Sequence, residues 1–140
     1  MDTADLNTEN FYTYSETTGN ILVEAQPFYL DERSIPEQEH FFFAYKIKVT
    51  NLGANSCSLM RRHWLIRNGR GAQREVEGAG VVGKQPEILP GESFSYTSFC
   101  PLNTPTGNMR GNFLFEDKVG NKFSATVPVF FLRLPDSFKH

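Results

Sequence analysis

The sequence predicts an all-β fold, a sandwich of two antiparallel β-sheets, and three observations lead to this prediction. Short runs of alternating apolar and polar residues recur along the chain. Turn signals rich in glycine, proline and asparagine separate these runs about every dozen residues. No stretch carries an apolar stripe at helical spacing. About seven or eight short strands in such an order are typical of a β-sandwich.

The composition describes one globular domain of 140 residues with a net charge of -2. Such a charge argues against bulk electrostatic binding to nucleic acid or to an anionic membrane. No apolar run is long enough to cross a membrane, and the N-terminus lacks a secretory signal, so the cytoplasm is the expected compartment. Cys57 and Cys100 are expected to be reduced thiols, with a single disulfide between them as the alternative.

The first 19 residues are polar and are expected to form a flexible N-terminal tail, so the folded domain is predicted over residues 20–140. The first strand is predicted over Ile21–Ala25, where apolar residues alternate. Pro27 limits the end of this strand to a sheet edge or a bulge, since proline has no N–H to donate.

The clearest strand is predicted over Phe41–Asn51. Every second residue from Phe41 to Val49 is apolar, whereas Lys46 and Lys48 fall on the other face. Because lysines mark the solvent side, the apolar set is expected to face the core. Further strands are predicted over residues 57–67, 72–77, 94–99, 110–116 and 122–134, separated by turns at 68–71, 90–91, 104–107 and 117–121.

Residues 77–86, the glycine loop, contain two sequence patterns known from phosphate sites. Gly78, Gly80 and Gly83 have the spacing of a dinucleotide-binding fingerprint, and the run from Gly78 to Lys84 has most of a Walker A pattern. Both patterns need a helix after the loop, which the two following prolines exclude. Walker A also needs Ser or Thr after the lysine, where this chain has Gln85. The glycine loop is therefore predicted to be neither site.

Two roles for the glycine loop remain open. Its glycines can permit positive φ and close backbone approach at a tight crossover between the sheets. Alternatively, successive backbone N–H groups form a concave nest for a phosphate, to which Lys84 adds charge. The candidate anion-binding residues are Gly78, Gly80, Gly83 and Lys84 of the loop, with Arg62 and His63 of the preceding strand.

Arg62, His63 and Trp64 also have a structural interpretation. In a strand, Arg62 and Trp64 share one face and His63 lies on the other. Trp64 then packs in the core, Arg62 lies along the surface or pairs with a carboxylate, and His63 makes a hydrogen bond. The sequence contains no nucleophile–base pattern and no metal-ligand spacing, so no catalytic residue, metal ligand or cofactor is assigned.

Beyond these patterns, the chain resembles the ApaG family from about Ile21 to Pro135. The most specific part is the run from Gly80 to Pro86, followed by Pro90-Gly91-Glu92. The other matching residues are Tyr29-Leu30, Ser34, Pro36, Phe43-Ala44-Tyr45, Ile47, Leu59, Arg62-His63-Trp64, Glu75-Val76-Glu77-Gly78, Phe94-Ser95-Tyr96-Thr97-Ser98, Thr104-Pro105, Gly107, Met109 and Gly111. Two departures fall on the loop and its neighbouring strand: Ala79, where the family often has glutamate, and Arg61, where it usually has serine.

The resemblance implies a sandwich of the fibronectin type III-like or immunoglobulin-like kind over residues 20–140. It also implies a bacterial stand-alone protein, linked loosely to cobalt and magnesium tolerance and encoded beside diadenosine tetraphosphate hydrolase. Related domains in eukaryotic F-box and polymerase-interacting proteins look like protein-interaction modules. The resemblance brings no catalytic residues, because the family has no agreed reaction.

The expected function is a non-catalytic binding or interaction module with a protein partner. The alternative is a weak binder of pyrophosphate or a (di)nucleoside polyphosphate, held by the glycine loop over residues 77–86. Neither nucleic acid nor a membrane is an expected partner, and the chain is expected to be a monomer or a weak homodimer.

Overall fold

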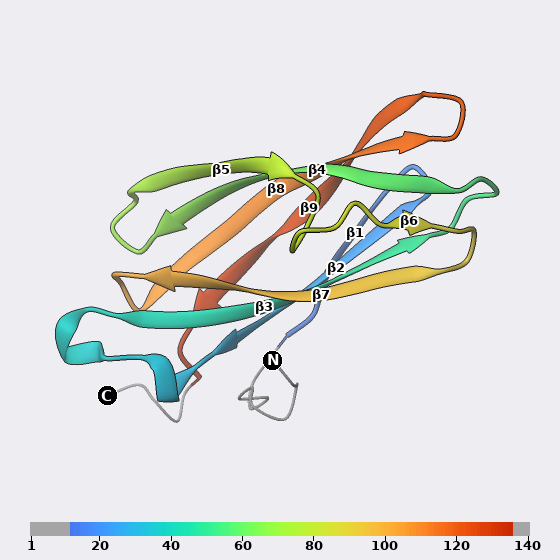
Figure 1. The fold of residues 1–140 in the computed structure, drawn as a ribbon. Helices are drawn as coiled ribbons and strands as arrows, with labels where there is room; N and C mark the ends of the chain where they lie inside the picture. The colour runs from blue at the N-terminus through green and yellow to red at the C-terminus, as the bar shows by residue number, and fades with distance from the viewer. Residues whose placement is uncertain (1–11, 136–140) are drawn as a thin grey trace.

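The protein is almost entirely β-strand in the computed structural model, which describes residues 12–135 (Figure 1). The strands are β1 (Tyr14–Thr18), β2 (Ile21–Tyr29), β3 (Phe41–Asn51), β4 (Cys57–Asn68), β5 (Gln73–Ala79), β6 (Glu87–Ile88), β7 (Ser93–Leu102), β8 (Thr106–Asp117) and β9 (Lys122–Arg133). Two short 3-10 helices, η2 (Asp31–Arg33) and η3 (Pro36–Gln38), join β2 to β3.

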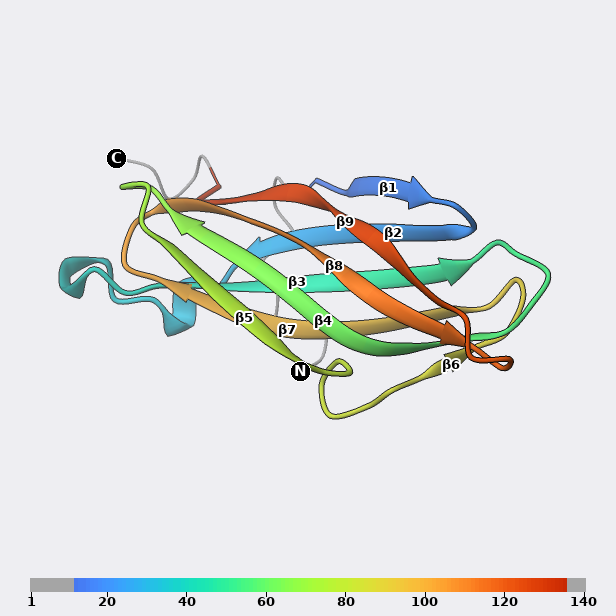
Figure 2. The same ribbon diagram turned by 90° about the horizontal axis from the view of Figure 1, so that it is seen from above.

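Two antiparallel sheets form the two layers of the molecule. One sheet has the order β1-β2-β3-β7, and the other has the order β5-β4-β8-β9, with β6 beside β4. The sheets stack face to face (Figure 1), and their strands cross at an angle when seen from above (Figure 2). The predicted two-sheet antiparallel sandwich is confirmed.

The core lies between the sheets and follows the alternation predicted for β3. Phe43, Ile47 and Val49 of this strand are fully buried, whereas Lys48 between them in sequence is exposed. The observed strand also has the predicted bounds, Phe41–Asn51. A strict two-residue period with lysines on one face is therefore sufficient to orient this strand.

An aromatic cluster fills the centre of the core. Trp64 on β4 is 2% exposed, which confirms that it packs inside. Its ring centroid lies 5.9 Å from those of Phe113 and Phe130, and 5.5 Å from that of Tyr45 in the opposite sheet. Aromatic pairs of this kind add about 0.5–1.5 kcal/mol each beyond the burial of apolar area. The cluster therefore joins the two sheets.

The two long sides of the sandwich differ. On one side β9 packs against β1 and β2, and the N–H of Thr126 donates a hydrogen bond of 3.0 Å to Thr18 Oγ1. On the other side β5 and β7 are the outer strands of their sheets. Arg74 reaches from β5 to β7, where its Nη2 donates to the carbonyl oxygen of Pro101 at 3.1 Å. We call the side formed by β5, β7 and the glycine loop the open side.

Strand β1 differs from the flexible tail predicted over residues 1–19. Tyr14–Thr18 pair antiparallel with the first half of β2. These residues are polar and largely exposed, so backbone pairing rather than an apolar face holds them. The ring of Tyr14 adds a contact of 6.5 Å to that of Phe130. Residues 1–11 of the predicted tail lie outside the described part of the chain.

Strand β2 continues to Tyr29, beyond the predicted end at Ala25, although it contains Pro27. Tyr14, the first residue of β1, pairs with Ala25, and β1 does not extend beyond this point. Pro27 therefore lies where β2 has a neighbouring strand on one side only. The missing N–H of the proline falls at a local sheet edge, as expected for a proline within a strand.

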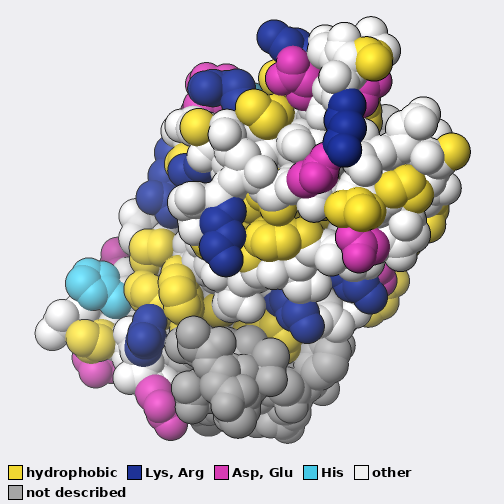
Figure 3. Space-filling model, turned by 45° about the vertical axis from the view of Figure 1, so that its right-hand side comes forward, with side chains coloured by type: hydrophobic (Ala, Val, Ile, Leu, Met, Phe, Trp, Pro, Cys, Tyr) yellow, Lys and Arg dark blue, Asp and Glu magenta, His cyan; other side chains and the backbone are white. Residues whose placement is uncertain are grey.

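The surface carries charges of both signs. Figure 3 shows Lys and Arg side chains interspersed with Asp and Glu, with hydrophobic side chains between them on the same face. This mixture agrees with the net charge of -2 and forms no single-sign patch on that face. Within residues 12–135, no helix is long and apolar enough to cross a membrane.

Replacing Trp64 by alanine is expected to lower the free energy of unfolding by about 3–5 kcal/mol, since loss of a buried indole leaves a large cavity. Val119→Ala, at a turn residue that is 82% exposed, is the control and should change stability by less than about 0.5 kcal/mol. Urea denaturation followed by circular dichroism measures both. A loss below about 1 kcal/mol for Trp64→Ala would contradict the assigned role of the aromatic cluster.

Candidate functional site

The glycine loop is held against an irregularity in β4. The pairing of β4 with β8 shifts register between Leu59 and Arg61, so Met60 forms a β-bulge outside the ladder. The carbonyl oxygen of Met60 accepts the N–H of Gly80 at 2.7 Å and the Nε2 of Gln85 at 3.0 Å. The bulge therefore fastens the loop at two points along its length.

The tip of the glycine loop is a tight two-residue turn. Val81 and Lys84 exchange two backbone hydrogen bonds, of 2.8 and 2.9 Å. Between them, Val82 and Gly83 have φ of 44° and 78°, which is typical of a type I′ turn. Val81 is fully buried and anchors this hairpin in the core, whereas Val82 is 50% exposed at the tip.

Gly80 is required by the path of the backbone. Its φ is +62°, and a Cβ at this position would overlap the carbonyl oxygen of Lys84. Gly83, at φ +78°, has open space where its Cβ would lie. We expected the glycines to permit positive φ and close backbone approach, and Gly80 meets both conditions.

The course of the chain after the hairpin corrects one expectation. A direct crossover between the sheets was predicted at the glycine loop, but the next strand, β6, pairs with β4 again. The chain reaches the other sheet only at β7. The hydrogen bonds to Met60 hold the loop on its own sheet. No helix follows the loop within the described residues, in agreement with the rejection of both phosphate patterns.

Arg62 lies beside the glycine loop, but its donors are directed at the carbonyl groups of the loop. Its Nη1 donates to the carbonyl oxygens of Ala79 at 3.0 Å and Gly80 at 3.1 Å. It stands opposite Gly78 in the β4–β5 pair, where a Cβ would come within 2.9 Å of Nη1. Gly78 therefore leaves room for the guanidinium group, which braces the loop.

His63 pairs with Glu77 at the start of the loop, but its side chain lies on the opposite face of β4 from that of Arg62 and is already paired. Its Nε2 is 2.6 Å from the Oε2 of Glu75 on β5. Lys84 is exposed and forms no ion pair with the described residues. The N–H groups of Val82 and Gly83 also have no hydrogen-bond partner in this part of the chain. The structure thus brings five of the six candidate anion-binding residues together, and at the tip the side chain of Lys84 and two N–H groups have no partner among the described residues.

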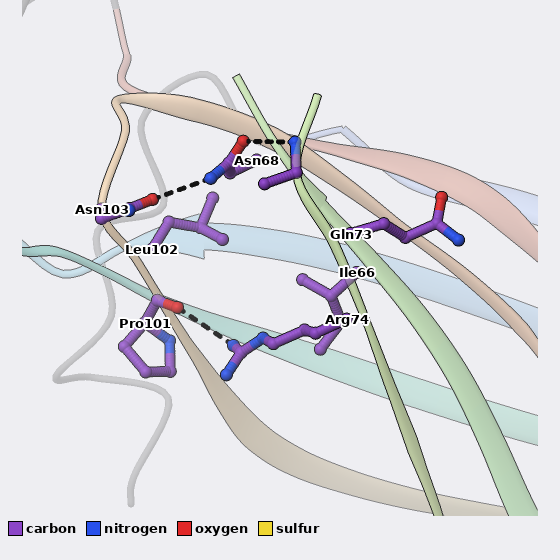
Figure 4. A pocket seen from close by; sticks show the side chains of 8 residues that line it. Ile66, Asn68, Gln73, Arg74, Pro101, Leu102 and Asn103 are labelled. Carbon is purple, nitrogen blue, oxygen red and sulfur yellow. Dashed lines mark hydrogen bonds between the residues drawn. The ribbon is translucent and has the colours of Figure 1, made fainter. Parts of the chain in front are cut away.

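A groove opens on the open side between β5 and β7 (Figure 4). Its volume is about 320 Å³. It is lined by Ile66, Asn68, Ala72, Gln73, Arg74, Pro101, Leu102 and Asn103. At its upper end the Nδ2 of Asn68 donates to the Oδ1 of Asn103 at 3.0 Å, and at its lower end Arg74 reaches Pro101. Strands β4 and β5 of one sheet and β7 of the other therefore form one recess.

Sequence reasoning missed Arg74, because a single arginine in a polar strand carries no motif. Its side chain spans the space between the sheets, and its Nη2 also lies 3.8 Å from the Sγ of Cys100. The one signal that could have found it is alternation: Arg74 and Val76 share a face of β5, and Val76 packs against the core. An arginine on the core-facing side of an outer strand is a candidate for contact with the opposite sheet.

The two cysteines are free and buried, in agreement with the expected pair of thiols. Burial raises the pKa of both Cys57 and Cys100 above the ordinary thiol value. The protonated thiol is therefore the resting form, and neither sulfur is prepared as a nucleophile. Burial also raises the pKa of the Tyr96 hydroxyl well above its usual value. This hydroxyl has no hydrogen-bond partner among the described residues.

A second hollow, of about 430 Å³, lies at the end of the sandwich near the β8–β9 turn. Its carboxylate, Asp117, accepts the N–H groups of Val119 and Asn121 at 3.0 and 2.9 Å. Hydrogen bonds from Asn121 hold the pKa of Asp117 below its ordinary value. Asp117 therefore serves the turn. Among residues 12–135 no group of three His, Cys, Asp or Glu side chains is placed to hold a metal ion.

The fold and the loop define a two-sheet β-sandwich protein whose distinguishing element is a glycine hairpin fastened to a β-bulge. The family model of the ApaG domain matches residues 31–117. The chain belongs to the ApaG domain family, as the resemblance predicted.

Relatives match over most of their length. Protein ApaG of Methylobacterium sp. (strain 4-46) is 48% identical over 122 residues, which cover 87% of this chain and 94% of the relative. Protein ApaG of Yersinia pseudotuberculosis serotype O:1b (strain IP 31758) is 48% identical over 115 residues, covering 82% and 92%. The crystal structure of the putative ApaA protein from Bordetella pertussis matches with a TM-score of 0.81 at 41% identity, covering 83% of this chain and 94% of that one.

Two alanine substitutions separate backbone strain from steric overlap in the loop. Both Gly80→Ala and Gly83→Ala place alanine at positive φ, which costs about 1–2 kcal/mol. Gly80→Ala adds the overlap with the Lys84 carbonyl group and is expected to cost at least about 3 kcal/mol. Gly83→Ala should lower the free energy of unfolding only by the cost of placing alanine at positive φ. Urea titrations of both variants make the comparison, and equal losses would contradict the role assigned to Gly80.

Proposed function

We propose that this ApaG-family protein is a non-catalytic interaction module that binds a partner protein in the cytoplasm through its open side. The observation that carries the proposal is the rigid hairpin tip. Val82 is half exposed at the end of a turn closed by two backbone hydrogen bonds between Val81 and Lys84. An apolar group already held in one conformation loses little entropy on binding, which favours its use as a contact residue.

The rest of the open side extends the contact region around the tip. β5 and β7 each have one edge with no strand partner in residues 12–135. The groove beside Arg74 lies between these edges, and its volume of about 320 Å³ is at the low end of the range of about 300–1,000 Å³ typical of small-molecule sites. A recess of this size suits one or two side chains of a partner better than a whole cofactor.

The non-catalytic part of the proposal rests on the side chains of the described residues. His63 and Glu75 form an imidazole–carboxylate pair. Within the described residues, no hydroxyl or thiol group is hydrogen-bonded to the imidazole ring of His63. The two thiols are buried and protonated. Acid–base and nucleophilic catalysis need a base within hydrogen-bond reach of the group that reacts. These side chains support binding rather than turnover.

A weak phosphate-binding role for the glycine loop is the second candidate, and one observation favours it. The N–H groups of Val82 and Gly83 have no hydrogen-bond partner among the described residues, and the exposed Lys84 follows them directly. Two N–H groups and one cation can hold an oxyanion. Pyrophosphate and (di)nucleoside polyphosphates are the ligands of this class. Arg62 and His63 add little, because their donors are engaged within the chain.

Val82→Asp is expected to weaken binding of the partner at least about tenfold, since it places a charge at an apolar contact. The partner is captured by affinity from a lysate of the native cell, purified, and titrated against each variant. Val119→Asp makes the same change at the tip of another exposed turn and should leave binding unchanged. Wild-type affinity for Val82→Asp, or equal losses for both variants, would contradict a contact at the hairpin tip.

Diadenosine tetraphosphate and ATP are expected to bind weakly, with a Kd of about 0.1–1 mM, and not to be hydrolysed. Added salt and Lys84→Ala should weaken binding further, whereas Lys118→Ala, at an exposed lysine of the β8–β9 turn, should not. Calorimetry measures binding, and a phosphate-release assay with magnesium or cobalt measures hydrolysis. Release on the order of 1 s⁻¹ that a glycine-loop variant abolishes would show the protein to be an enzyme.

A further inference from the structure

The groove between β5 and β7 offers hydrogen-bond donors, since each of its side-chain amide oxygens already accepts at least one hydrogen bond. The Oδ1 of Asn68 accepts the N–H groups of Arg70 and Ala72, at 2.9 and 3.0 Å. The Oδ1 of Asn103 accepts the Nδ2 of Asn68 at 3.0 Å. The Nδ2 of Asn103 donates no hydrogen bond among the described residues, so the groove favours a ligand that is an acceptor.

Two further acceptors at the groove each accept one hydrogen bond. The Oε1 of Gln73 accepts the Nη2 of Arg67 at 3.2 Å, and the side-chain amide of Gln73 is turned away from Arg74 (Figure 4). The carbonyl oxygen of Pro101 accepts the Nη2 of Arg74 at 3.1 Å. The hydrogen-bonding pattern of the groove therefore favours an anion.

Arg74 supplies the positive charge that would balance such an anion. Its Nη1 and Nε have no hydrogen-bond partner among the described residues. No Asp or Glu lines the groove, and Arg74 forms no ion pair within residues 12–135. A guanidinium group with unused N–H groups presents a planar fork that matches the two oxygens of a carboxylate.

The floor of the groove is apolar. Ile66 and Leu102 line it beside Arg74 and are 6% and 8% exposed. A ligand that fills the groove therefore places an apolar group on these two side chains and an anionic group on the neighbouring guanidinium. Both groups must be close together, since the whole recess measures about 320 Å³.

We infer that the groove binds the C-terminal residue of a partner polypeptide, with its α-carboxylate on Arg74 and its apolar side chain on Ile66 and Leu102. This inference rests on the proposed interaction function and names the part of the partner that is recognised. A C-terminal residue carries the carboxylate and the apolar side chain on one Cα, which an Asp or Glu side chain does not. One guanidinium balances the single charge of a carboxylate, whereas a phosphate group carries about -1.5 to -2.

The test uses short acetylated peptides that end in leucine, titrated into the isotope-labelled protein and followed by NMR chemical shifts. The peptide with a free carboxylate is expected to bind with a Kd of about 1 mM and to shift the amide signals of Arg74 and Leu102. The same peptide with a C-terminal amide should bind at least about tenfold more weakly, because the charge-assisted hydrogen bonds are lost.

Arg74→Gln should weaken binding of the free acid by a similar factor. Arg110→Gln removes the same charge from an exposed arginine of β8 outside the groove and should leave binding unchanged. The chemical-shift spectrum of each variant also reports whether it is folded. If Arg74→Gln were unfolded, the acid–amide comparison on the wild-type protein would still decide the question.

Several results would overturn the inference: equal affinity for acid and amide, no binding at about 10 mM peptide, or equal loss in both arginine variants. An amidated peptide with an internal aspartate that binds as well as the free acid would also overturn it. If the peptide bound at the hairpin tip and still bound there in Arg74→Gln, the groove would be rejected as the binding site, but the proposed interaction function would not. The proposed interaction function would then stand or fall with the Val82 variant.

Discussion

The contact between the two sheets around Trp64 sets the positions of the other parts of the molecule. Tyr45 of one sheet meets Trp64 and Phe130 of the other at ring distances of 5.5 and 5.7 Å. To fill this core, β4 must bury both Leu59 and Trp64, which strict alternation would place on opposite faces. The bulge between Leu59 and Arg61 adds one residue, and both side chains then face inward.

The glycine loop follows from this bulge. The bulge leaves the carbonyl group of Met60 outside the ladder, and such a group needs a partner when it is covered by chain. Gly80 and Gln85 provide two donors, so the loop must approach β4 closely at Gly80, where a Cβ would collide with backbone. Arg62, the next inward-facing residue before Trp64, then bonds to the carbonyl groups of the loop. A pattern that resembles a phosphate motif is in this way explained by the packing of a strand.

How much the sequence predicts depends on how each element is held. Strand β3 could be predicted to its end residues, because its side chains alternate between the core and lysines. Strand β1 could not, since Tyr14–Thr18 has no apolar alternation and is held by backbone pairing with β2. The two prolines after the glycine loop were enough to exclude a helix. The partner of the loop was not predictable, because the register shift at Met60 depends on how β4 packs against the opposite sheet. Arg74 was missed for the same reason, since only the stacking of the sheets gives it a hydrogen-bond partner on β7.

In the function that we propose, the open side meets a partner without offering strand edges to every other chain. At Pro101 the edge of β7 has no N–H, and its carbonyl oxygen is occupied by Arg74. β5 carries Glu75 and Glu77. Proline and charged residues on outer strands discourage edge-to-edge pairing, so the recognition that we propose for this side depends on side chains: the hairpin tip at Val82 and the guanidinium group of Arg74. One nitrogen of Arg74 closes the edge of β7, while the other two make no hydrogen bond with residues 12–135. Protection of the edge and the anion recognition that we infer are therefore combined in one residue, placed where the two sheets come together.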